Sequence, residues 1–450
     1  MTGEVAVLGL GKSGRSAALL LVREGRRVYV SDADPNASWP SAPSSVEVEA
    51  GSHDLARIGA ASLVVTSPGI PPTAPPLAAA RASGVPIISE VELALRAMPG
   101  LRYIAVTGTN GKTTTTALIG HVLRGLGYNA IDAGNIGLPL AQVALNSTGN
   151  VPGSSGGVDW VALELSSFQL HDTPSVDATV SVLTNLSPDH LDRYATVEDY
   201  YADKGRLFVN ARSASKIVVN ADDPASLGLV AGVPGTHYHF SVAGHPADAT
   251  LNADSLKLGA DILMPRSGLQ LLGVHNVANA LAAALAVMVA DPEHTAPQAR
   301  LKIAESLGTF RALPHRLQLI GEYQGVHWIN DSKATNVSSA LVALESMTRP
   351  TILLAGGIHK GEPYTALAAP LSRIGKAVLA YGEAAPLIVA DLAGKVPVER
   401  LGRDFDEVIA RARALAAPGD AVLLAPACSS FDMFHNYVER GETFARLAPS

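Results

Sequence analysis

Residues 103–120 are YIAVTGTNGKTTTTALIG, an apolar β-branched run followed by a glycine-rich turn and a segment suited to a helix. In a strand–turn–helix of this kind, backbone N–H groups at the start of the helix converge on phosphate oxygens. The spacing departs from the usual G-x-x-x-x-G-K-[ST] loop, because Val106 stands where the first glycine belongs. The stretch therefore predicts a phosphate-binding loop in an α/β protein, with an unusual spacing.

The residues of this loop have separate predicted roles. Lys112 would neutralise charge on the terminal phosphates of a nucleotide, and Thr113 would offer its hydroxyl to Mg²⁺. A chance Gly-Lys-Thr in a surface turn is the alternative, and the strand and helix on either side argue against it. We expect ATP with Mg²⁺. The loop residues predicted to bind ATP are Gly108, Thr109, Asn110, Gly111, Lys112, Thr113 and Thr114.

Composition and pattern predict an α/β fold with several domains. A chain of 450 residues has room for about two to four domains, and 47% hydrophobic residues with 41 glycines are typical of a folded protein. Short apolar runs alternate with Ala/Leu-rich stretches, the pattern of parallel sheets covered on both faces. We predict a Rossmann-like domain over 1–97, a central P-loop-type ATPase domain with a mostly parallel sheet over 98–312, and a Rossmann-like α/β domain over 313–450. The Pro/Gly/Ser-rich segment 146–159 predicts a flexible surface loop.

Charge, cysteine content and hydropathy limit the classes of partner. The net charge of −7 and the pI near 6.0 argue against a nucleic-acid-binding surface. Cys428, the single cysteine, excludes an intrachain disulfide and suits a reducing compartment. The most apolar stretch, VANALAAALAVMVA from Val277, is shorter than the roughly 20 residues that span a bilayer. We expect a cytoplasmic monomer that is not inserted in a membrane and that binds small acidic ligands.

A second glycine motif, Gly9–Gly14 (GLGKSG), follows an apolar run at the N-terminus. Asp32 ends the next apolar run about 20 residues later, which completes the fingerprint of a dinucleotide-binding turn. Glycines in such a turn let the backbone approach a pyrophosphate closely. The ligand stays open at this point, because NAD, another nucleotide and a turn kept only for packing all fit the pattern.

Polar residues at the ends of other predicted elements are candidates for metal and nucleotide binding. Glu164 ends the apolar run WVALE, where an unpaired carboxylate would be costly, so we consider it a ligand of Mg²⁺. His190 lies in a loop after another strand and is either a ligand or a solvated side chain. Taken without the other motifs, Lys204 is interpreted as an exposed lysine on a helix. Asn276 and Asn279 share a helix face and either bind a purine or cap the helix.

The last block places further polar residues at junctions beside predicted strands, where binding residues of α/β sheets tend to lie. These are Arg316, Asp331, Lys333, Lys360 and Ser430.

Taken together, the motifs resemble those of the Mur ligases, ATP-dependent amide ligases that build the peptide stem of bacterial peptidoglycan. In chain order they are TGTNGKTTT, LELSSFQL, DHLDRY, GVHNVANALAA, PHRLQ, NDSKATN, AGGIHKG and PACSSFD. They extend over nearly the whole chain and all three blocks. The Gly9–Gly14 turn, GNIGLP from Gly134 and PACSSFD are similar to the branch of the family that adds D-glutamate. A shortened phosphate loop is normal for this family.

The resemblance implies an activity. The enzyme would add D-glutamate to UDP-N-acetylmuramoyl-L-alanine (UDP-MurNAc-L-Ala) through an acyl phosphate, releasing ADP and phosphate, in the synthesis of peptidoglycan precursors. It would use ATP and two Mg²⁺ ions, with a carbamate on Lys204 extending the metal shell.

The resemblance also implies residue roles. The residues implied in catalysis are Lys112, Glu164, His190, Lys204 and Arg316. Those implied in metal binding are Thr113, Glu164, His190 and the carbamylated Lys204. Beyond the loop, ATP would contact Asn276, Asn279, Arg316, Asp331 and Lys333. The UDP-sugar would contact Lys12, Ser13, Asp32, Ser67, Gly69, Asn135 and His190. D-glutamate would contact Thr335, Lys360, Ser430, Phe431 and Tyr437.

Three alternatives remain. One is another amide ligase of the same superfamily, adding a different amino acid or acting on folate. The second is a P-loop kinase or NTPase fused to an NAD-linked oxidoreductase domain, but no catalytic His or Tyr–Lys pair is evident between Gly14 and Pro99. The third is a non-enzymatic nucleotide sensor, which leaves Lys360 and Ser430 without a role.

Overall fold

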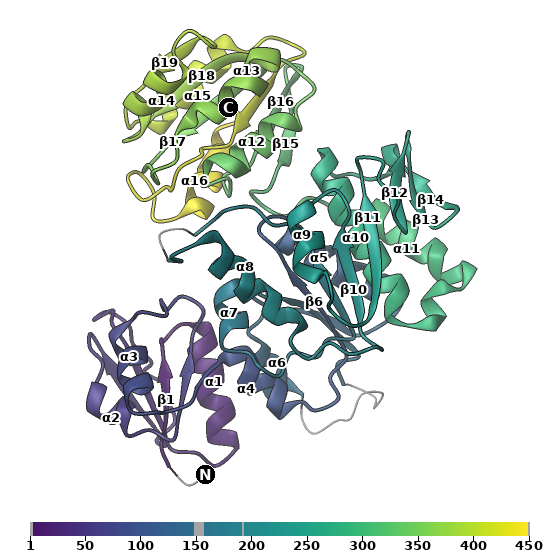
Figure 1. The fold of residues 1–450 in the computed structure, drawn as a ribbon. Helices are drawn as coiled ribbons and strands as arrows, with labels where there is room; N and C mark the ends of the chain where they lie inside the picture. The colour runs from purple at the N-terminus through teal and green to yellow at the C-terminus, as the bar shows by residue number, and fades with distance from the viewer. Residues whose placement is uncertain (1–2, 148–156, 191–192, 449–450) are drawn as a thin grey trace. The chain divides into compact units, whose positions relative to one another are not determined.

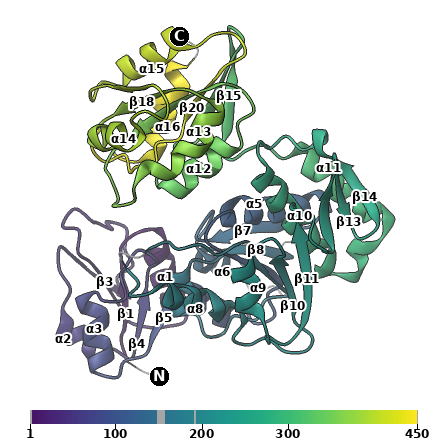
Figure 2. The ribbon, with the colours of Figure 1, turned by 45° about the horizontal axis from the view of Figure 1, so that its top comes forward.

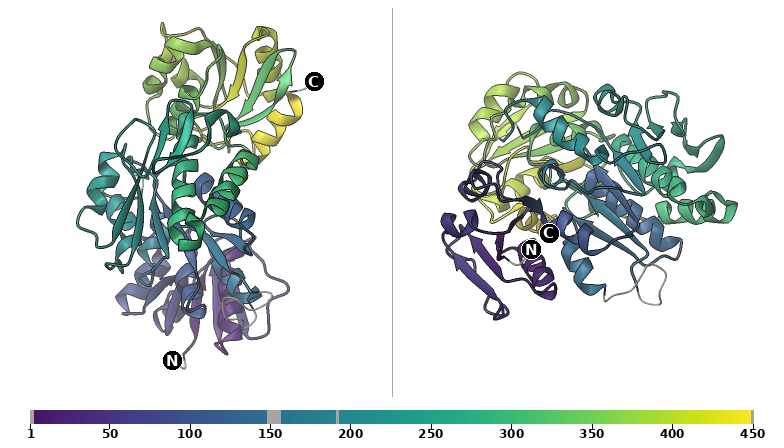
Figure 3. Two further views of the ribbon diagram at one scale, coloured as in Figure 1. Left: turned by 90° about the vertical axis from the view of Figure 1, so that its right-hand side faces the viewer. Right: turned by 60° about the horizontal axis from the view of Figure 1, so that its bottom comes forward.

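The structure is a computed structural model that describes residues 3–147, 157–190 and 193–448. Most of the predicted surface loop 146–159 lies outside these described residues. The chain divides into two compact units, Met1–Leu269 with Val277–Thr309, and Gln270–Asn276 with Phe310–Ser450. Within the described ranges the strands form three sheets, which are drawn in Figure 1 and from other directions in Figures 2 and 3. The α/β prediction is confirmed.

The first sheet is parallel and has the strand order β3-β2-β1-β4-β5. Val5 and Val7 of β1 pack into one apolar cluster, and Ala6 and Leu8 pack into another, so this strand is buried on both faces. The strands are β1 Val5–Leu8, β2 Val28–Asp32, β3 Val46–Ala50, β4 Leu63–Thr66 and β5 Ile87–Ser89. The helices are α1 Lys12–Arg23, α2 Leu55–Gly59, α3 Pro75–Ala82 and α4 Glu90–Ala97.

The second sheet has the order β14-β13-β12-β11-β10-β9-β6-β8-β7. It is parallel from β7 to β12, and β12, β13 and β14 pair antiparallel. The strands are β6 Tyr103–Thr107, β7 Ala130–Gly134, β8 Trp160–Glu164, β9 Val180–Leu183, β10 Lys216–Asn220, β11 Thr236–Ser241, β12 Ala249–Asn252, β13 Ser255–Leu258 and β14 Asp261–Pro265. The α-helices are α5 Lys112–Gly125, α6 Leu140–Asn146, α7 Ser167–His171, α8 Val197–Gly205, α9 Pro224–Val230, α10 Val274–Ala290 and α11 Pro297–Thr309. Short 3₁₀ turns are η1 Arg206–Phe208, η2 Arg266–Gly268 and η3 Pro292–Thr295.

The third sheet has the order β15-β16-β20-β17-β18-β19 and is parallel except for β15. Leu353 packs on one face of β17, and Ile352 and Leu354 pack on the other. The strands are β15 Gln318–Tyr323, β16 Val326–Asn330, β17 Thr351–Gly356, β18 Gly375–Tyr381, β19 Val398–Arg400 and β20 Ala421–Leu424. The helices are α12 Val337–Glu345, η4 Tyr364–Leu367, α13 Ala368–Ile374, α14 Ala385–Leu392, α15 Phe405–Leu415 and α16 Tyr437–Leu447.

The strand orders explain where ligands fit. In the first sheet β1 lies between β2 and β4, and in the second β6 lies between β8 and β9. The connections on the two sides of each central strand therefore run in opposite directions, which opens a crevice at the carboxyl ends of the strands. The Gly9–Gly14 turn and Ser67 follow β1 and β4, while the phosphate loop follows β6.

Two details differ from the sequence-based predictions. The Ala-rich helix α10 begins at Val274, so Asn276 lies inside the helix and does not precede it. Several strands were not predicted: β3, β5, β7, β11–β15 and β19. No helix in the described part of the chain has the length and apolarity of a membrane span.

Candidate active site

The phosphate loop connects β6 to α5, as its sequence predicts. Gly108 has a φ of +146° and Gly111 a φ of +81°, values that side chains rarely adopt. A Cβ atom on Gly108 would lie 2.0 Å from Oγ1 of Thr184. Glycine is therefore required at the first position both by its backbone conformation and by the close approach of a neighbouring loop.

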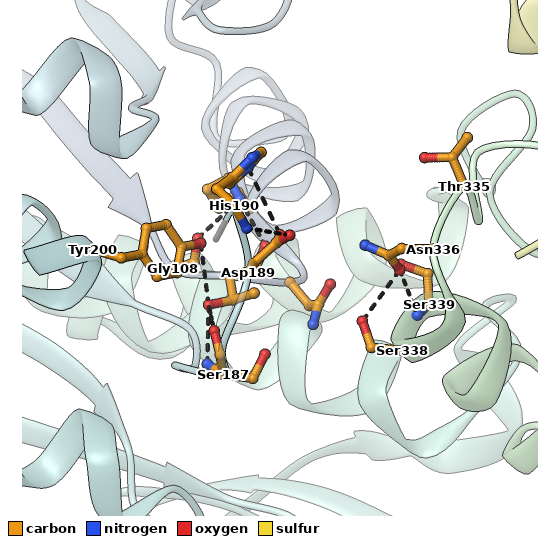
Figure 4. A network of polar contacts seen from close by, with 12 residues as sticks. Gly108, Ser187, Asp189, His190, Tyr200, Thr335, Asn336, Ser338 and Ser339 are labelled. Atoms are coloured by element: carbon orange, nitrogen blue, oxygen red, sulfur yellow. Dashed lines mark hydrogen bonds and ion pairs between the residues drawn. The ribbon is translucent and has the colours of Figure 1, made fainter. Parts of the chain in front are cut away.

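The segment after β9 holds this loop in place. The amide N of Asn110 donates to Oδ1 of Asn185 at 2.9 Å, and Nδ2 of Asn185 donates back to the Asn110 carbonyl at 3.0 Å. Oγ1 of Thr184 donates to the same carbonyl at 2.6 Å. Thr109 Oγ1 and the backbone of Ser187 exchange bonds of 3.0 and 3.1 Å. Figure 4 draws Ser187 and Gly108 in the same network of polar contacts. Sequence reasoning missed these supporting residues, although they directly precede the motif that contains His190.

Two lysines meet at one carbonyl of the loop. Lys112 Nζ donates to the carbonyls of Gly108 at 2.9 Å and Thr109 at 2.8 Å, and Lys204 Nζ donates to Gly108 O at 2.7 Å. Lys204 is 1% exposed, and its Nζ lies 4.5 Å from the centre of the Tyr200 ring. The interpretation of Lys204 as an exposed helix lysine is therefore wrong. Burial, and next the positive charge of Lys112, lower the pKa of Lys204 well below its ordinary value.

Glu164 ends β8 and is 1% exposed. Its Oε1 accepts a bond of 2.8 Å from Nδ2 of Asn135, a residue that we had assigned to the sugar. Its Oε2 is buried and has no hydrogen-bond partner among the described residues. A buried carboxylate oxygen in this state is suited to a cation. In the same part of the chain, no three His, Cys, Asp or Glu side chains gather as a metal site, so a cation here would also need hydroxyl, phosphate or carbamate oxygens.

His190 follows β9 and has a strained backbone, with a φ of +54°. Its amide N donates to Oδ1 of Asp189 at 2.8 Å, and its Nε2 lies 3.7 Å from Oδ2 of the same residue. The ring packs against Phe168 and Tyr200, with centroid distances of 5.3 and 5.9 Å. Figure 4 shows His190, Asp189 and Tyr200 together. The half-exposed imidazole is therefore held in position by a carboxylate and two rings.

The two asparagines of α10 have different environments. Asn279 Oδ1 accepts a bond of 3.2 Å from Thr115 Oγ1, and a Cβ on Gly111 would lie 2.3 Å from the same oxygen. Asn279 therefore packs directly on the phosphate loop. Asn276 Nδ2 donates to Leu272 O at 2.8 Å. This bond is not an N-cap, in which a side-chain oxygen accepts from a backbone N–H, and Asn276 lies inside α10.

The N-terminal turn has the geometry of a dinucleotide-binding turn. Asp32 Oδ2 accepts from the amide of Leu10 at 2.7 Å, so the acid at the end of β2 fixes the glycine turn. A Cβ on Gly14 would lie 1.8 Å from Gly9 O, and one on Gly9 would lie 2.7 Å from Ser67 Oγ. Ser67 Oγ is buried with no partner in the described ranges, and Ser67 lines a small pocket with residues of α7. The other residues assigned to the UDP-sugar here are Lys12 and Ser13 in the first turn of α1 and the exposed Gly69.

In the second unit, Asp331 and Lys333 follow β16, and Arg316, the other cation assigned to ATP, precedes β15. Asp331 is buried, and its Oδ1 accepts a bond of 3.2 Å from the amide of Leu317. Burial raises the pKa of Asp331 to about 7, against the lowering effects of that bond and of Arg316. Lys333 Nζ lies 4.2 Å from the ring centre of Tyr437, which brings an ATP-assigned residue against a D-glutamate-assigned one.

The remaining residues assigned to D-glutamate lie after β16, β17 and β20. Lys360 Nζ donates to Thr335 Oγ1 at 3.4 Å. Ser430 is 2% exposed, whereas Phe431 is 70% exposed. The carboxyl ends of three adjacent strands are thus followed by a cation, two hydroxyl groups and the exposed residue Phe431, a set suited to carboxylate binding. Close by, the cap of α12 is made by Asn336, whose Oδ1 accepts from Ser338 and Ser339 (Figure 4).

Fold and site define a nucleotide-binding α/β protein with a phosphate loop. Residues 3–89 match the Mur ligase MurD-like N-terminal domain, residues 106–287 the Mur ligase middle domain and residues 315–428 the Mur ligase glutamate ligase domain.

Curated relatives match along the full chain. The chain is 40% identical over 464 residues to the UDP-N-acetylmuramoylalanine--D-glutamate ligase of Anaeromyxobacter dehalogenans, covering 99% of this chain and 97% of that protein. It is 39% identical over 442 residues to the protein of the same name from Solibacter usitatus, covering 98% and 96%. The chain belongs to the Mur ligase family, and the resemblance seen in its motifs is confirmed.

A solved structure gives the same fold. The crystal structure of UDP-N-acetylmuramate-alanine ligase MurC from Thermotoga maritima is 18% identical in sequence, with a TM-score of 0.61 over 99% of this chain and 98% of that one. At this identity the likeness supports the three-domain fold alone.

Proposed function

We propose that this chain is the ATP-dependent ligase that joins D-glutamate to UDP-MurNAc-L-Ala, releasing ADP and phosphate, in the synthesis of peptidoglycan precursors in the cytoplasm. The observation that carries the proposal is the alignment of this chain with a relative that is named for this reaction, over 97% of the relative's length. We place the domain boundaries after residues 97 and 312 and propose that the enzyme is a monomer.

The first chemical step would activate the substrate carboxylate. A carboxylate oxygen attacks the γ-phosphorus of ATP, and the bond from this phosphorus to the β,γ-bridging oxygen breaks. ADP departs, and the substrate carboxylate has become an acyl phosphate. The loop amides of Gly108–Gly111 would surround the phosphates, with Lys112 exchanging its two carbonyl partners for phosphate oxygens. Arg316 and Lys333 would add positive charge near the transferring group, with Asp331 on the ribose and Asn276 and Asn279 on the adenine side.

The site fits magnesium and a modified lysine. Thr113, Glu164, His190 and a carbamylated Lys204 would hold Mg²⁺, which would neutralise phosphate charge when bound. The unpartnered Oε2 of Glu164 supports this assignment. The lowered pKa of Lys204 favours the neutral amine, the form that reacts with CO₂. Its nitrogen lone pair forms the C–N bond, one C=O electron pair moves to oxygen, and the nitrogen proton goes to solvent, leaving a carbamate anion.

The second chemical step would form the amide. The amine of D-glutamate attacks the acyl phosphate carbonyl and forms a tetrahedral intermediate. The acyl C–O bond then breaks, so that phosphate leaves with the former carboxylate oxygen and the proton of the amine goes to solvent. Water must be excluded, since it would hydrolyse the acyl phosphate. The residues proposed to hold the two carboxylates of D-glutamate are Thr335, Lys360, Ser430, Phe431 and Tyr437. The residues proposed to hold the UDP-sugar are Lys12, Ser13, Asp32, Ser67, Gly69, Asn135 and His190.

A substrate panel tests the proposal. Purified protein is given ATP, Mg²⁺ and UDP-MurNAc-L-Ala with each of a set of amino acids, and phosphate release and product mass are measured together. We expect phosphate release in step with a new amide only for D-glutamate. Turnover with L-alanine on the unsubstituted muramoyl nucleotide, and none with D-glutamate, would overturn the assignment.

Replacing the loop lysine provides the control. Lys112→Ala should abolish phosphate release while the circular dichroism spectrum stays that of the wild type. Substantial residual ligation by a folded Lys112→Ala protein would exclude the phosphate role of this side chain.

A further inference from the structure

A charged cluster outside the assigned residues joins α7 to α8. It is centred on Asp203, which is 7% exposed. Asp203 Oδ1 lies 2.8 Å from Nδ1 of His171 and 3.0 Å from Nε of Arg206, and its Oδ2 accepts from the hydroxyl of Tyr194 at 3.0 Å. The carboxylate thus receives bonds from the end of α7, from the segment before α8 and from the residue that follows α8.

The His171–Asp203 bond is the shielded part of this cluster. The side chain of His171 is 33% exposed and that of Arg206 is 47% exposed. The bond to Asp203 raises the pKa of His171. Burial alone would raise the pKa of Asp203, but the bond and charge of His171, together with the bond from Tyr194 and the charge of Arg206, outweigh it and the pKa is lowered. A half-buried pair with this geometry holds two elements together more firmly than an exposed ion pair does.

The cluster stands next to the buried lysine of the active site. Lys204 follows Asp203 on α8, and Tyr200 lies one turn earlier with its hydroxyl 3.4 Å from Thr109 Oγ1. Burying Lys204 is unfavourable for its charged form, and α8 is a helix of nine residues that has little stability of its own. Contacts elsewhere on α8 must therefore hold this helix against the phosphate loop.

The other end of the bond also leads to the active site. His171 is the last residue of α7, which begins directly after the strand that ends in Glu164. The start of α7 is fixed by a capping box between Ser166 and Gln169. Phe168 of α7 stacks on the ring of Tyr194 at 5.6 Å and 7°. One end of the His171–Asp203 bond is thus tied to the metal-assigned carboxylate, and the other to the metal-assigned lysine.

We propose that the His171–Asp203 bond positions Lys204 for carbamylation, by fixing α8 against α7 so that Nζ stays at the Gly108 carbonyl. Both are positioning residues, since neither is placed on substrate. The inference rests on the proposed function, because it concerns the carbamate of that same site.

Three histidine variants test the inference. His171→Ala removes the bond, and His171→Asn keeps a neutral donor near the position of Nδ1. The matched control is His245→Ala, because His245 Nδ1 lies 3.0 Å from Oδ1 of Asp222 in the same unit, in a bond that involves neither α7 nor α8. Each full-length protein is equilibrated with ¹³C-bicarbonate, and the carbamate carbon signal is measured by NMR alongside kcat, KM and the thermal midpoint.

We expect His171→Ala to lose most of the carbamate signal and about tenfold in kcat, with the KM values for UDP-MurNAc-L-Ala and D-glutamate unchanged. His171→Asn should keep most of the signal, and His245→Ala should equal the wild type. Wild-type signal and kcat in His171→Ala would overturn the inference, as would equal losses in the Ala and Asn variants at an unchanged thermal midpoint. If His171→Ala fails to fold, Asp203→Asn takes its place in the comparison with His245→Ala, with the same expected losses.

The two proposals fail separately. Wild-type protein with a carbamate signal but no amide formed from D-glutamate refutes the proposed function, and the NMR comparison still decides the positioning role. Wild-type protein that forms the amide without any carbamate signal refutes the positioning role alone.

Discussion

Adding one methyl group to Gly111 should weaken the protein through a single identifiable contact. Gly111 has a φ of +81°, and its Cβ as alanine would lie 2.3 Å from Oδ1 of Asn279. The left-handed conformation costs an alanine roughly 1–2 kcal/mol. The Asn279 amide must also move and lose the bond from Thr115 Oγ1, which costs about 1 kcal/mol. Gly111→Ala should therefore destabilise the first unit by about 2–3 kcal/mol.

A double-mutant cycle separates the two contributions. In an Asn279→Ala background the obstructing oxygen is gone, so Gly111→Ala should cost only the roughly 1–2 kcal/mol of the backbone. The expected coupling between the two substitutions is about 1 kcal/mol, a factor of about five in the folding equilibrium. Urea unfolding of the four proteins gives the free energies, and ADP binding by calorimetry reports whether the loop is displaced.

A second glycine provides the control. Gly25 has a φ of +74°, and its added Cβ would meet no heavy atom within 4 Å. Gly25→Ala should thus show the backbone cost alone, with no coupling to Asn279. If Gly111→Ala costs no more than Gly25→Ala, or if its cost is the same in both backgrounds, the close contact with Asn279 has no energetic effect and the reasoning is refuted.

Three further predictions concern charges. Glu164→Gln keeps the bond acceptor for Asn135 but removes the charge at the unpartnered Oε2. Ligase activity measured across a Mg²⁺ titration should therefore fall by about 100-fold or more, with the thermal midpoint unchanged. A wild-type dependence of activity on Mg²⁺ would contradict the metal assignment. Burial raises the pKa of Asp331 to about 7, whereas the pKa of an aspartate in an unfolded chain is about 4. The native state therefore binds this proton more tightly, and the stability of the protein falls as the pH rises from about 4 to about 7. In urea unfolding, Asp331→Asn should therefore be more stable than the wild type at about pH 8 and similarly stable at about pH 4. A difference in stability that does not change with pH would argue against the buried acid. Removing dissolved CO₂ should lower wild-type activity, and bicarbonate should restore it, whereas activity that never responds to CO₂ would count against a carbamate on Lys204.

Much of the fold follows from local sequence patterns. The strands that were predicted are continuous apolar runs buried on both faces, such as β6 and β8. Missed strands have other patterns: β3 is VEVEA, half-buried at a sheet edge, and β12–β14 form an antiparallel meander in which β12 and β13 alternate polar and apolar residues. Short edge strands are stabilised by pairing with neighbours more than by their own composition, so a local pattern does not mark them.

The site was predictable to the level of motifs and no further. Glycine turns and polar residues at strand ends follow from the rule that ligands meet the carboxyl ends of parallel strands. That rule does not specify which side chains touch. The Lys204–Gly108 bond joins residues 96 positions apart, and the Asn135–Glu164 bond joins two strand ends. Such contacts depend on the order of strands in the sheet, which a motif does not encode.

Gly108 illustrates how one residue can have two requirements. Its missing side chain admits Thr184, because any Cβ would overlap that hydroxyl. Its carbonyl accepts bonds from both Lys112 and Lys204, so the position of the backbone sets the separation of the two cations. Burial, and next the charge of Lys112, lower the pKa of Lys204, so the conformation of Gly108 contributes to this shift through the position that it sets for Lys112. A motif identifies this residue as a glycine of the phosphate loop, and only the folded chain explains why its carbonyl matters as much as its missing Cβ.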